Sequence, residues 1–264
     1  MNVPGAALPG EVARTTISVV IPCHDDAPFL ARCLSALAAQ TRPADEIIVV
    51  DNGSSDDSGR IAVAAGATVI SEPVIGIPRA AAVGYDAARH EVIARLDADS
   101  VPGPDWLARI ERDMARPDVD FITGTAHFYG GNPAIRWIGR HLYIGAMYVV
   151  LTPLLGHAPL FGSNMAMRAT AWHELSAGFH RSEDRIHDDL DLSLHIRPDM
   201  GVLYDAGLVV QVSARPFENW PSLRRRLDRV LPTLRLHWPQ EAPWYRLPAR
   251  RRARKADAHS SVRE

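Results

Sequence analysis

The chain of 264 residues carries 29 lysines and arginines against 31 aspartates and glutamates, a formal net charge of −2. Hydrophobic residues make up 47% and charged residues 23%, which excludes a disordered or fibrous chain and allows a core without disulfide or metal staples. The near-neutral charge excludes a global field that recruits nucleic acid. Cys23 and Cys33 are the only cysteines, which excludes a disulfide scaffold or cysteine-rich zinc site and favours a reducing, cytoplasmic location. None of the 11 histidines belongs to an HxxxH pair on an evident helix.

Residues 1–15 lie before the first predicted strand. They have no charged start and no apolar stretch of the roughly 7–15 residues that a secretory signal contains. We therefore expect a flexible leader.

Strand and helix patterns alternate through the first part of the chain. Short β-branched runs predict buried strands, and apolar residues at helical spacing predict helices between them. The predicted strands are residues 17–21, 46–50, 68–71 and 92–96, and the predicted helices are residues 29–40, 79–89, 104–114 and one from Ser54 or Ser55 towards Gly66. This order predicts an α/β fold with a mostly parallel, Rossmann-like sheet flanked by helices. Beyond Val119 the alternation of strand and helix patterns is no longer regular.

Polar residues cluster where three of these strands end, at residues 23–26, 51–54 and 97–100. Ligands of such sheets bind outside the carboxyl ends of the strands, so these patches are expected to converge on one crevice. The turn at residues 22–26 reads PCHDD and lacks a glycine-rich phosphate loop, which excludes a dinucleotide site. Because the strand ends are acidic, a phosphorylated ligand here needs a divalent cation.

Asp97 and Asp99 form an Asp-x-Asp pair that can bind Mg²⁺ or Mn²⁺ through oxygen. The same pattern occurs at residues 118/120 and 189/191, but only the first pair follows a buried β run and precedes a proline-rich turn and a helix. The position of Asp97 and Asp99 directly after a buried strand favours a metal site. The alternative is a solvated turn.

Five ordered blocks resemble the family 2 glycosyltransferases of the GT-A fold. The blocks are ISVVIPCHDDAPFLARCLSALAAQT, EIIVVDNGSSDDSGRIA, ARLDADSVPGPDWL, FGSNMAMRATAWHEL and HDDLDLSLHI, and they span residues 16–197. The resemblance implies one glycosyltransferase domain over residues 16–240, with a nucleotide half at about 16–115 and an acceptor half at about 116–240. Residues 241–264 are then a basic tail.

The resemblance also implies which residues bind the nucleotide sugar. They are Pro22, His24, Asp26, Asp51, Asn52, Arg79, Asp97 and Asn164. Asp51 can accept an N–H of uracil or of guanine, so a UDP or a GDP sugar is implied. Ala81 and Ala82 stand where the family often has Arg-Asn, so Arg79 is either a phosphate ligand or a surface residue. Asp25 and Asp26 stand where the family often has Asn and Glu.

The catalytic residues implied by the resemblance are carboxylates. Asp99, with Asp97, would hold a Mn²⁺ or Mg²⁺ ion that neutralises the diphosphate leaving group. Asp189, or else Asp188, would be the general base that activates the acceptor hydroxyl, with inversion at the anomeric carbon. The alternative for these two residues is a helix N-terminus enriched in acids. The loop Gly162-Ser163-Asn164 would border the sugar and the acceptor, with a structural loop as the alternative.

The implied function is transfer of one sugar from a nucleotide-diphosphate sugar to an unknown hydroxyl acceptor. A processive polymerase is not favoured, because residues 234–238 do not supply the Gln-x-x-Arg-Trp motif. A catalytically silent nucleotide-sugar-binding or membrane-surface protein is one alternative. A sugar-nucleotide nucleotidyltransferase is another, but it needs a glycine-rich basic loop after the first strand.

Two segments raise the question of a membrane. Six basic residues lie between Arg246 and Lys255, and such a segment either binds anionic lipid or is a solvated tail. The apolar stretch at residues 142–155 contains Pro153 and is shorter than the about 20 residues that a membrane span needs. We expect it to be a buried core helix, with an interfacial helix as the alternative. A lipid-linked acceptor would make the enzyme peripheral at the inner face of the membrane.

Overall fold

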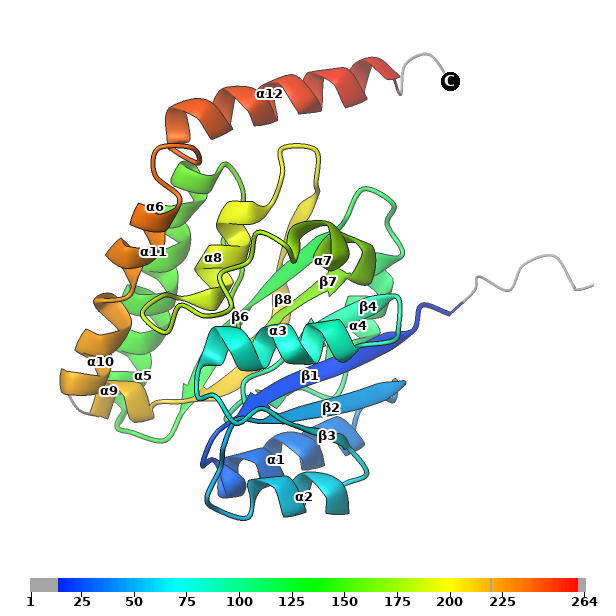
Figure 1. Cartoon of the computed structure of the whole chain (residues 1–264), viewed down its shortest axis with the longest axis vertical. Helices are drawn as coiled ribbons and strands as arrows, with labels where there is room; N and C mark the ends of the chain where they lie inside the picture. Colours follow the sequence, from blue (N-terminus) through cyan, green and yellow to red (C-terminus); the bar gives the residue numbers. More distant parts are fainter. Residues whose placement is uncertain (1–13, 219, 261–264) are drawn as a thin grey trace, which may run out of the picture.

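The computed structural model describes residues 14–218 and 220–260, in which helices cover both faces of an eight-stranded sheet (Figure 1). Its strand order is β3-β2-β1-β4-β7-β6-β8-β5. Residues 1–13 of the predicted leader and residues 261–264 of the predicted tail lie outside the described residues.

The first half of the sheet has the parallel arrangement that the sequence predicts. Its strands are β1 (Ile17–Cys23), β2 (Glu46–Asp51), β3 (Thr68–Ser71) and β4 (Val92–Arg95), and their pairings with one another are all parallel. The helices of this half are α1 (Ala27–Ala38), α2 (Ser58–Ala64), α3 (Ile77–Ala87) and α4 (Trp106–Met114). The predicted α/β alternation is confirmed.

Side chains of β1 alternate between two hydrophobic cores, one on each face of the sheet. Val19 and Ile21 belong to the core that contains residues of α1 and α4, whereas Val20 packs with residues of α3. A strand that is buried on both faces reads as a continuous apolar run, which explains why the sequence identified β1 correctly.

The second half of the sheet is mixed. Its strands are β5 (Val101–Pro102), β6 (Phe121–Tyr129), β7 (Met165–Arg168) and β8 (Val202–Ser213). β7 is antiparallel to β4 and to β6, while β6 and β8 are parallel with an irregularity between Thr123 and Thr125. A side chain on Gly124 would meet the Leu208 carbonyl oxygen at 2.2 Å, so glycine is needed at this irregularity.

The expectation of a buried core helix at residues 142–155 is wrong. The segment belongs to a continuous helix made of α5 (Pro133–Ile138), the π-helical η1 (Gly139–Ile144) and α6 (Gly145–Leu155). Within α6 only Leu155 is buried, and Val149 is 76% exposed. By length and composition alone, Pro133–Leu155 could cross a membrane. The stretch is apolar on all sides, so its pattern could not distinguish a core helix from an exposed one.

The remaining helices lie around the second half of the sheet: the seventh lies near α3, the ninth to eleventh run along the left side of the view, and the twelfth crosses above the sheet (Figure 1). They are α7 (Ala169–Leu175), α8 (Asp188–His195), α9 (Arg215–Glu218), α10 (Trp220–Leu227), α11 (Val230–Leu236) and α12 (Pro243–Ser260). A small third core joins α6, α8 and α11 through Leu155, Leu190, Leu194 and Leu234.

The expectation of a basic tail from residue 241 is also wrong over its first part. α12 is helical, and Arg246 and Arg250 are buried. Arg246 donates to the carbonyls of Ser193 and Ile196 at 3.3 and 3.2 Å, and Arg250 donates to Ile196 and Arg197 at 3.2 Å each. Guanidinium groups satisfy the free carbonyls at a helix C-terminus, and this contact holds α12 against the end of α8.

Candidate active site

The ends of β1 and β2 are held together by their own polar groups. The ring nitrogen Nδ1 of His24 lies 2.9 Å from the Asn52 carbonyl oxygen. The Asp25 amide donates to the Ser54 hydroxyl at 3.1 Å, and the Asp25 carboxylate accepts the Ser55 amide at 2.7 Å. Asp25 has a φ of 50°, a left-handed conformation that aspartate tolerates better than most residues. The PCHDD turn, with Pro22 in β1, therefore forms a fixed rim beside the end of β2.

Asp51 and Asn52 at the end of β2 have different surroundings. Asp51 is half-buried, and its Oδ1 accepts the Ser54 amide at 3.0 Å. The Asn52 side chain is buried and donates to the carbonyls of Glu72 and Val74 at 2.9 and 2.8 Å. It also accepts the Gly76 amide at 2.8 Å. Asn52 therefore shapes the 72–76 loop with its side chain.

Asn164 is likewise buried and occupied within the protein. Its Oδ1 accepts the Trp106 indole N–H at 2.8 Å, and its Nδ2 donates to the carbonyls of Thr125 and Leu208 at 2.8 and 2.7 Å. The sequence placed it among the ligand-contacting residues because a polar residue in an uncharged stretch is typical of a ligand-facing turn. In the structure it anchors the 162–164 loop to the sheet.

The Asp97-Ala98-Asp99 turn follows β4, as the sequence predicts. Asp97 is one-third exposed, and its two oxygens accept hydrogen bonds from Arg95 at 3.1 Å and from the Ser163 hydroxyl at 2.5 Å. The Asp99 side chain is 16% exposed. Burial and the neighbouring charge of Asp97 raise the pKa of Asp99 to about 6, although Arg215 opposes the shift. The turn thus holds more negative charge than its neighbours neutralise, which suits a divalent cation.

Arg215, from α9, is a site residue that the sequence reasoning missed. One nitrogen lies 2.8 Å from Asp26 and the other 3.5 Å from Asp99, and the guanidinium stacks 3.6 Å from the ring centre of Phe29. It joins the end of β1 to the Asp97–Asp99 turn. No motif marks Arg215, because its partners lie far away in the sequence.

Arg95, in β4, links the same turn to α8. Its guanidinium is buried and pairs with Asp97 and with Asp188, and it also donates to the Tyr85 hydroxyl at 3.2 Å. Burial raises the pKa of Asp188, and the charge of Arg95 opposes that shift. Asp188 is therefore a buried partner of an arginine that stays charged.

Asp189 is the more accessible carboxylate of the pair. It is partly exposed and accepts the amides of Gly162 and Leu190 at 2.9 and 2.8 Å. The adjacent Ser163 donates to Asp97, so the 162–163 loop bonds to both carboxylates. A side chain on Gly162 would approach the Arg95 guanidinium to about 3.0 Å, so the loop lies directly on Arg95.

The structure brings most of the predicted site residues to one place. Arg215 joins Asp26 to Asp99, while Arg95 and the 162–163 loop join Asp97 to Asp188 and Asp189. The backbone of the Asp97-Ala98-Asp99 turn links these two sets of contacts. Arg79 contacts a different segment, because it donates to the Ser182 hydroxyl at 3.0 Å.

The curated relatives of the chain are glycosyltransferases. Glycosyltransferase AglE of Haloferax volcanii is 31% identical over 132 residues, which is 46% of this chain and 43% of that protein. The undecaprenyl-phosphate 4-deoxy-4-formamido-L-arabinose transferase of Pseudomonas fluorescens is 30% identical over 132 residues, 46% of this chain and 38% of that protein. The matches thus span less than half the length of these relatives.

Solved structures share the fold. S. aureus TarS, solved with UDP-GlcNAc, superposes with a TM-score of 0.60 at 15% identity, covering 75% of this chain and 58% of that one. Glucosyl-3-phosphoglycerate synthase of Mycobacterium tuberculosis, solved with Mn²⁺, UDP and glucosyl-3-phosphoglycerate, gives 0.50 at 20% identity, covering 76% and 70%. The family model for glycosyl transferase family 2 matches residues 18–175, which is more than half of the chain. The chain therefore belongs to glycosyl transferase family 2, and its fold is of the GT-A type.

Proposed function

We propose that the protein transfers one sugar from a nucleotide-diphosphate sugar to a hydroxyl acceptor with inversion of the anomeric configuration. The observation that carries the proposal is the 162–163 loop, which bonds to Asp189 with one residue and to Asp97 with the next. A proton acceptor is thereby held beside the acidic turn at which the diphosphate is proposed to bind. Residues 16–240 act as one glycosyltransferase domain, with a nucleotide half and an acceptor half.

The donor is proposed to bind at the ends of β1 and β2. His24, Asp26 and Asp51 surround this rim, and the Asp51 carboxylate is half-buried and accepts a base N–H of uracil or guanine. UDP and UDP-GlcNAc are named as ligands in the solved structures that share the fold, which favours a UDP sugar. Pro22, Asn52 and Asn164 contribute by fixing the backbone around the donor, since both amide side chains are occupied within the protein.

Asp99 and Asp97 are proposed to hold a Mn²⁺ or Mg²⁺ ion. The donor set fits the ion, because two carboxylates on one turn offer hard oxygen ligands and the raised pKa of Asp99 marks uncompensated negative charge. When bound, the ion neutralises charge on the departing nucleoside diphosphate. Arg215 and Arg226 add positive charge near the same turn, as their lowering effect on the pKa of Asp99 indicates.

Asp189 is proposed to be the general base. It removes the proton of the acceptor hydroxyl as that oxygen attacks the anomeric carbon and the bond to the diphosphate breaks. The Gly162 and Leu190 amides orient its carboxylate. Asp188 is not available for this role, because it is buried and paired with Arg95.

The acceptor is proposed to be lipid-linked and the enzyme to work at the inner, cytoplasmic face of a membrane. The surface of α5, η1 and α6 exposes Trp137, Leu142, Val149 and Val150. Exposed apolar and aromatic side chains of this kind enter the interface of a bilayer. Arg251 and Arg252 of α12 are exposed and would attract anionic lipid heads. Membrane contact is thus proposed through a helix face rather than through a free tail.

A donor panel tests the proposal. UDP, GDP and dTDP sugars are added with and without Mn²⁺, and both the melting temperature and nucleoside diphosphate release are measured. The proposal requires one donor class that raises the melting temperature and is turned over. Binding without turnover would indicate a silent nucleotide-sugar-binding protein, and pyrophosphate as the product would indicate a nucleotidyltransferase.

A further inference from the structure

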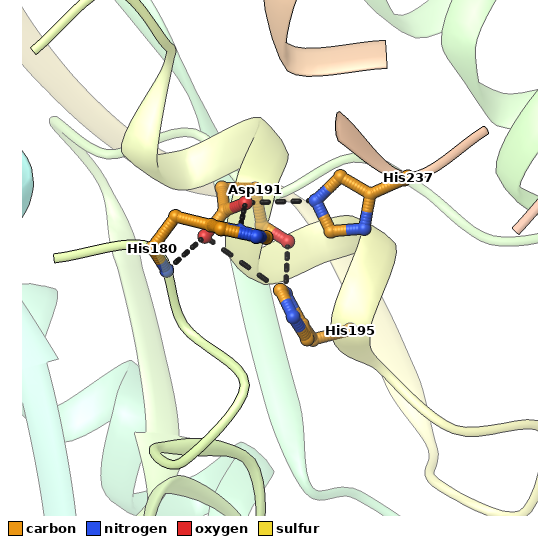
Figure 2. A group of neighbouring side chains, drawn as sticks. All are labelled: His180, Asp191, His195 and His237. Carbon is orange, nitrogen blue, oxygen red and sulfur yellow. Dashed lines mark hydrogen bonds and ion pairs between the residues drawn. The ribbon is translucent and has the colours of Figure 1, made fainter. Parts of the chain in front are cut away.

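Three histidines surround one buried carboxylate of α8 (Figure 2). Asp191 and His195 lie on α8, His180 lies in the segment before α8, and His237 directly follows α11. His180 Nδ1 and His237 Nε2 both lie 2.7 Å from Oδ1 of Asp191. His195 Nδ1 lies 3.9 Å from Oδ2 of the same carboxylate. Four groups from three segments therefore converge on one point.

The cluster is separate from the carboxylates of the candidate active site. Residues 189 and 191 lie two positions apart on α8, and two positions on a helix turn the side chain by about 200°. Asp189 accordingly contacts Gly162, whereas Asp191 contacts His180 and His237. Ions bound at the two places would not share a ligand.

The composition and geometry of the cluster suit zinc. Imidazole nitrogens with one carboxylate oxygen are zinc ligands, whereas Mg²⁺ and Mn²⁺ prefer oxygen. The four ligand atoms lie within 4.8 Å of one another. In a tetrahedral site with zinc–ligand distances of about 2.0–2.1 Å they would lie about 3.3 Å apart. The two 2.7 Å contacts to Asp191 would therefore open and the wider separations would close when the ion binds.

The residues around the cluster leave room for the His195 ring and leave a path by which an ion can enter from solvent. A side chain on Gly178 would come within 2.8 Å of the His195 ring, so glycine at this position lets the ring sit where it does. His180 lines an open pocket formed by residues 176, 177 and 179–183, which provides a path from solvent. Asp191 and His237 are buried, so the other side of the site is closed.

We propose that His180, Asp191, His195 and His237 bind one structural zinc ion. The ion would tie the segment before α8 and the end of α11 to α8 itself. Since α11 also packs on α8 and α6 through Leu190, Leu194 and Leu234, the ion would fasten the C-terminal helices to the transferase core. It would also stabilise α8, the helix that begins with Asp188 and Asp189.

Metal analysis of the full-length protein, made without a polyhistidine tag, tests the proposal. We expect one zinc ion per chain after dialysis, a lower melting temperature after chelation, and its recovery when zinc alone is added back. Cobalt substitution should give the visible absorption of a tetrahedral site. His180→Ala, at a partly exposed position, should raise the zinc Kd by at least roughly tenfold, and His237→Ala should do the same.

Two control variants make the result specific. His173→Ala removes an exposed histidine of α7, and Asp99→Ala removes the proposed cation ligand of the crevice; both should retain one zinc ion. If His237→Ala fails to fold, His180→Ala decides alone. A chain without zinc that gives no cobalt bands and no response to added zinc overturns the proposal, and so does zinc binding that both histidine variants leave unchanged. The four residues would then be a hydrogen-bonded cluster only.

Discussion

Substituting Asp189 distinguishes between the two carboxylates at the start of α8. Asp189→Asn keeps the shape of the side chain and removes the proton acceptor. We expect kcat to fall by roughly 10²–10⁴, the usual contribution of a positioned general base. Donor affinity should change little, because Asp189 contacts the backbone of Gly162 and Leu190.

The structural cost of Asp189→Asn follows from these two contacts. Each carboxylate oxygen accepts one backbone N–H, but an asparagine amide has a single acceptor oxygen, so one N–H loses its partner. Asp189 is partly exposed, and water can replace the missing bond. We expect a loss of about 1 kcal/mol, which lowers the Tm of a chain of this size by roughly 2–4 °C.

Asp188→Asn should mainly affect stability and not turnover. It removes a carboxylate from the buried Arg95 guanidinium, and breaking a buried ion pair costs about 3–5 kcal/mol. The Tm should therefore fall by roughly 10 °C. Loss of turnover with a small change in Tm is thus expected at residue 189, and a large change in Tm at residue 188.

The assay measures nucleoside diphosphate release at saturating donor, with thermal unfolding in parallel. Asp118→Asn is the matched control, since Asp118 belongs to another Asp-x-Asp pair and is exposed beside Arg116. It should leave turnover unchanged. If Asp189→Asn turns over at the wild-type rate while Asp188→Asn stays folded and inactive, the reasoning is refuted and Asp188 is the base.

Removing the crevice cation with EDTA should abolish transfer, and Mn²⁺ should restore it; full activity of chelated protein would contradict the cation proposal. Because the pKa of Asp99 is raised to about 6, its ionised form destabilises the folded chain as pH rises from about 4 through about 6. In chelated protein, Asp99→Asn should therefore raise the free energy of unfolding by up to about 3 kcal/mol at about pH 8 and change it little at about pH 4. If the Tm of the variant equals that of the wild type at both pH values, this expectation is refuted. Val149→Asp on α6 should abolish co-sedimentation with anionic liposomes, whereas Val63→Asp, on another exposed apolar residue in α2, should not. Equal loss in both variants would show that α6 is not the membrane contact. Arg246→Ala should destabilise the chain by about 2–4 kcal/mol, because it removes the side-chain donor to the carbonyls of Ser193 and Leu194, and an unchanged unfolding curve would contradict the packing of α12.

The nucleotide half of the fold was predictable because its signals are local. β1 and β2 are β-branched runs buried on both faces, and their ends carry polar turns that bond to each other. The Asp97–Asp99 turn was identified from its position after such a run. The mixed half was not predictable, since β7 pairs with two strands that are distant in the sequence.

Side-chain partners were the least predictable feature of the site. Asn52 and Asn164 stand in turns typical of ligand contacts, but their amides bond to backbone and to an indole N–H. Arg95 and Arg215 resemble ordinary strand and helix arginines until tertiary packing brings carboxylates to them.

The histidine cluster had only a weak signal in the sequence. Asp191 and His195 are separated by four positions, so one helix face presents both. The pair does not match the HxxxH pattern, because its first residue is an aspartate. His180 joins the cluster through the fold of the segment before α8, and His237 through the packing of α11 on α8.

The anomeric configuration of the first product shows directly whether the sugar is transferred with inversion. The donor identified by the panel is incubated with Mn²⁺ and wild-type protein, and the transferred or water-released sugar is followed by NMR before it mutarotates. An α-linked donor should give the β-anomer first, at a rate that Asp189→Asn lowers by at least roughly 10². An α-anomer as the first product, or an equal rate in the variant, would contradict direct displacement with Asp189 as the base.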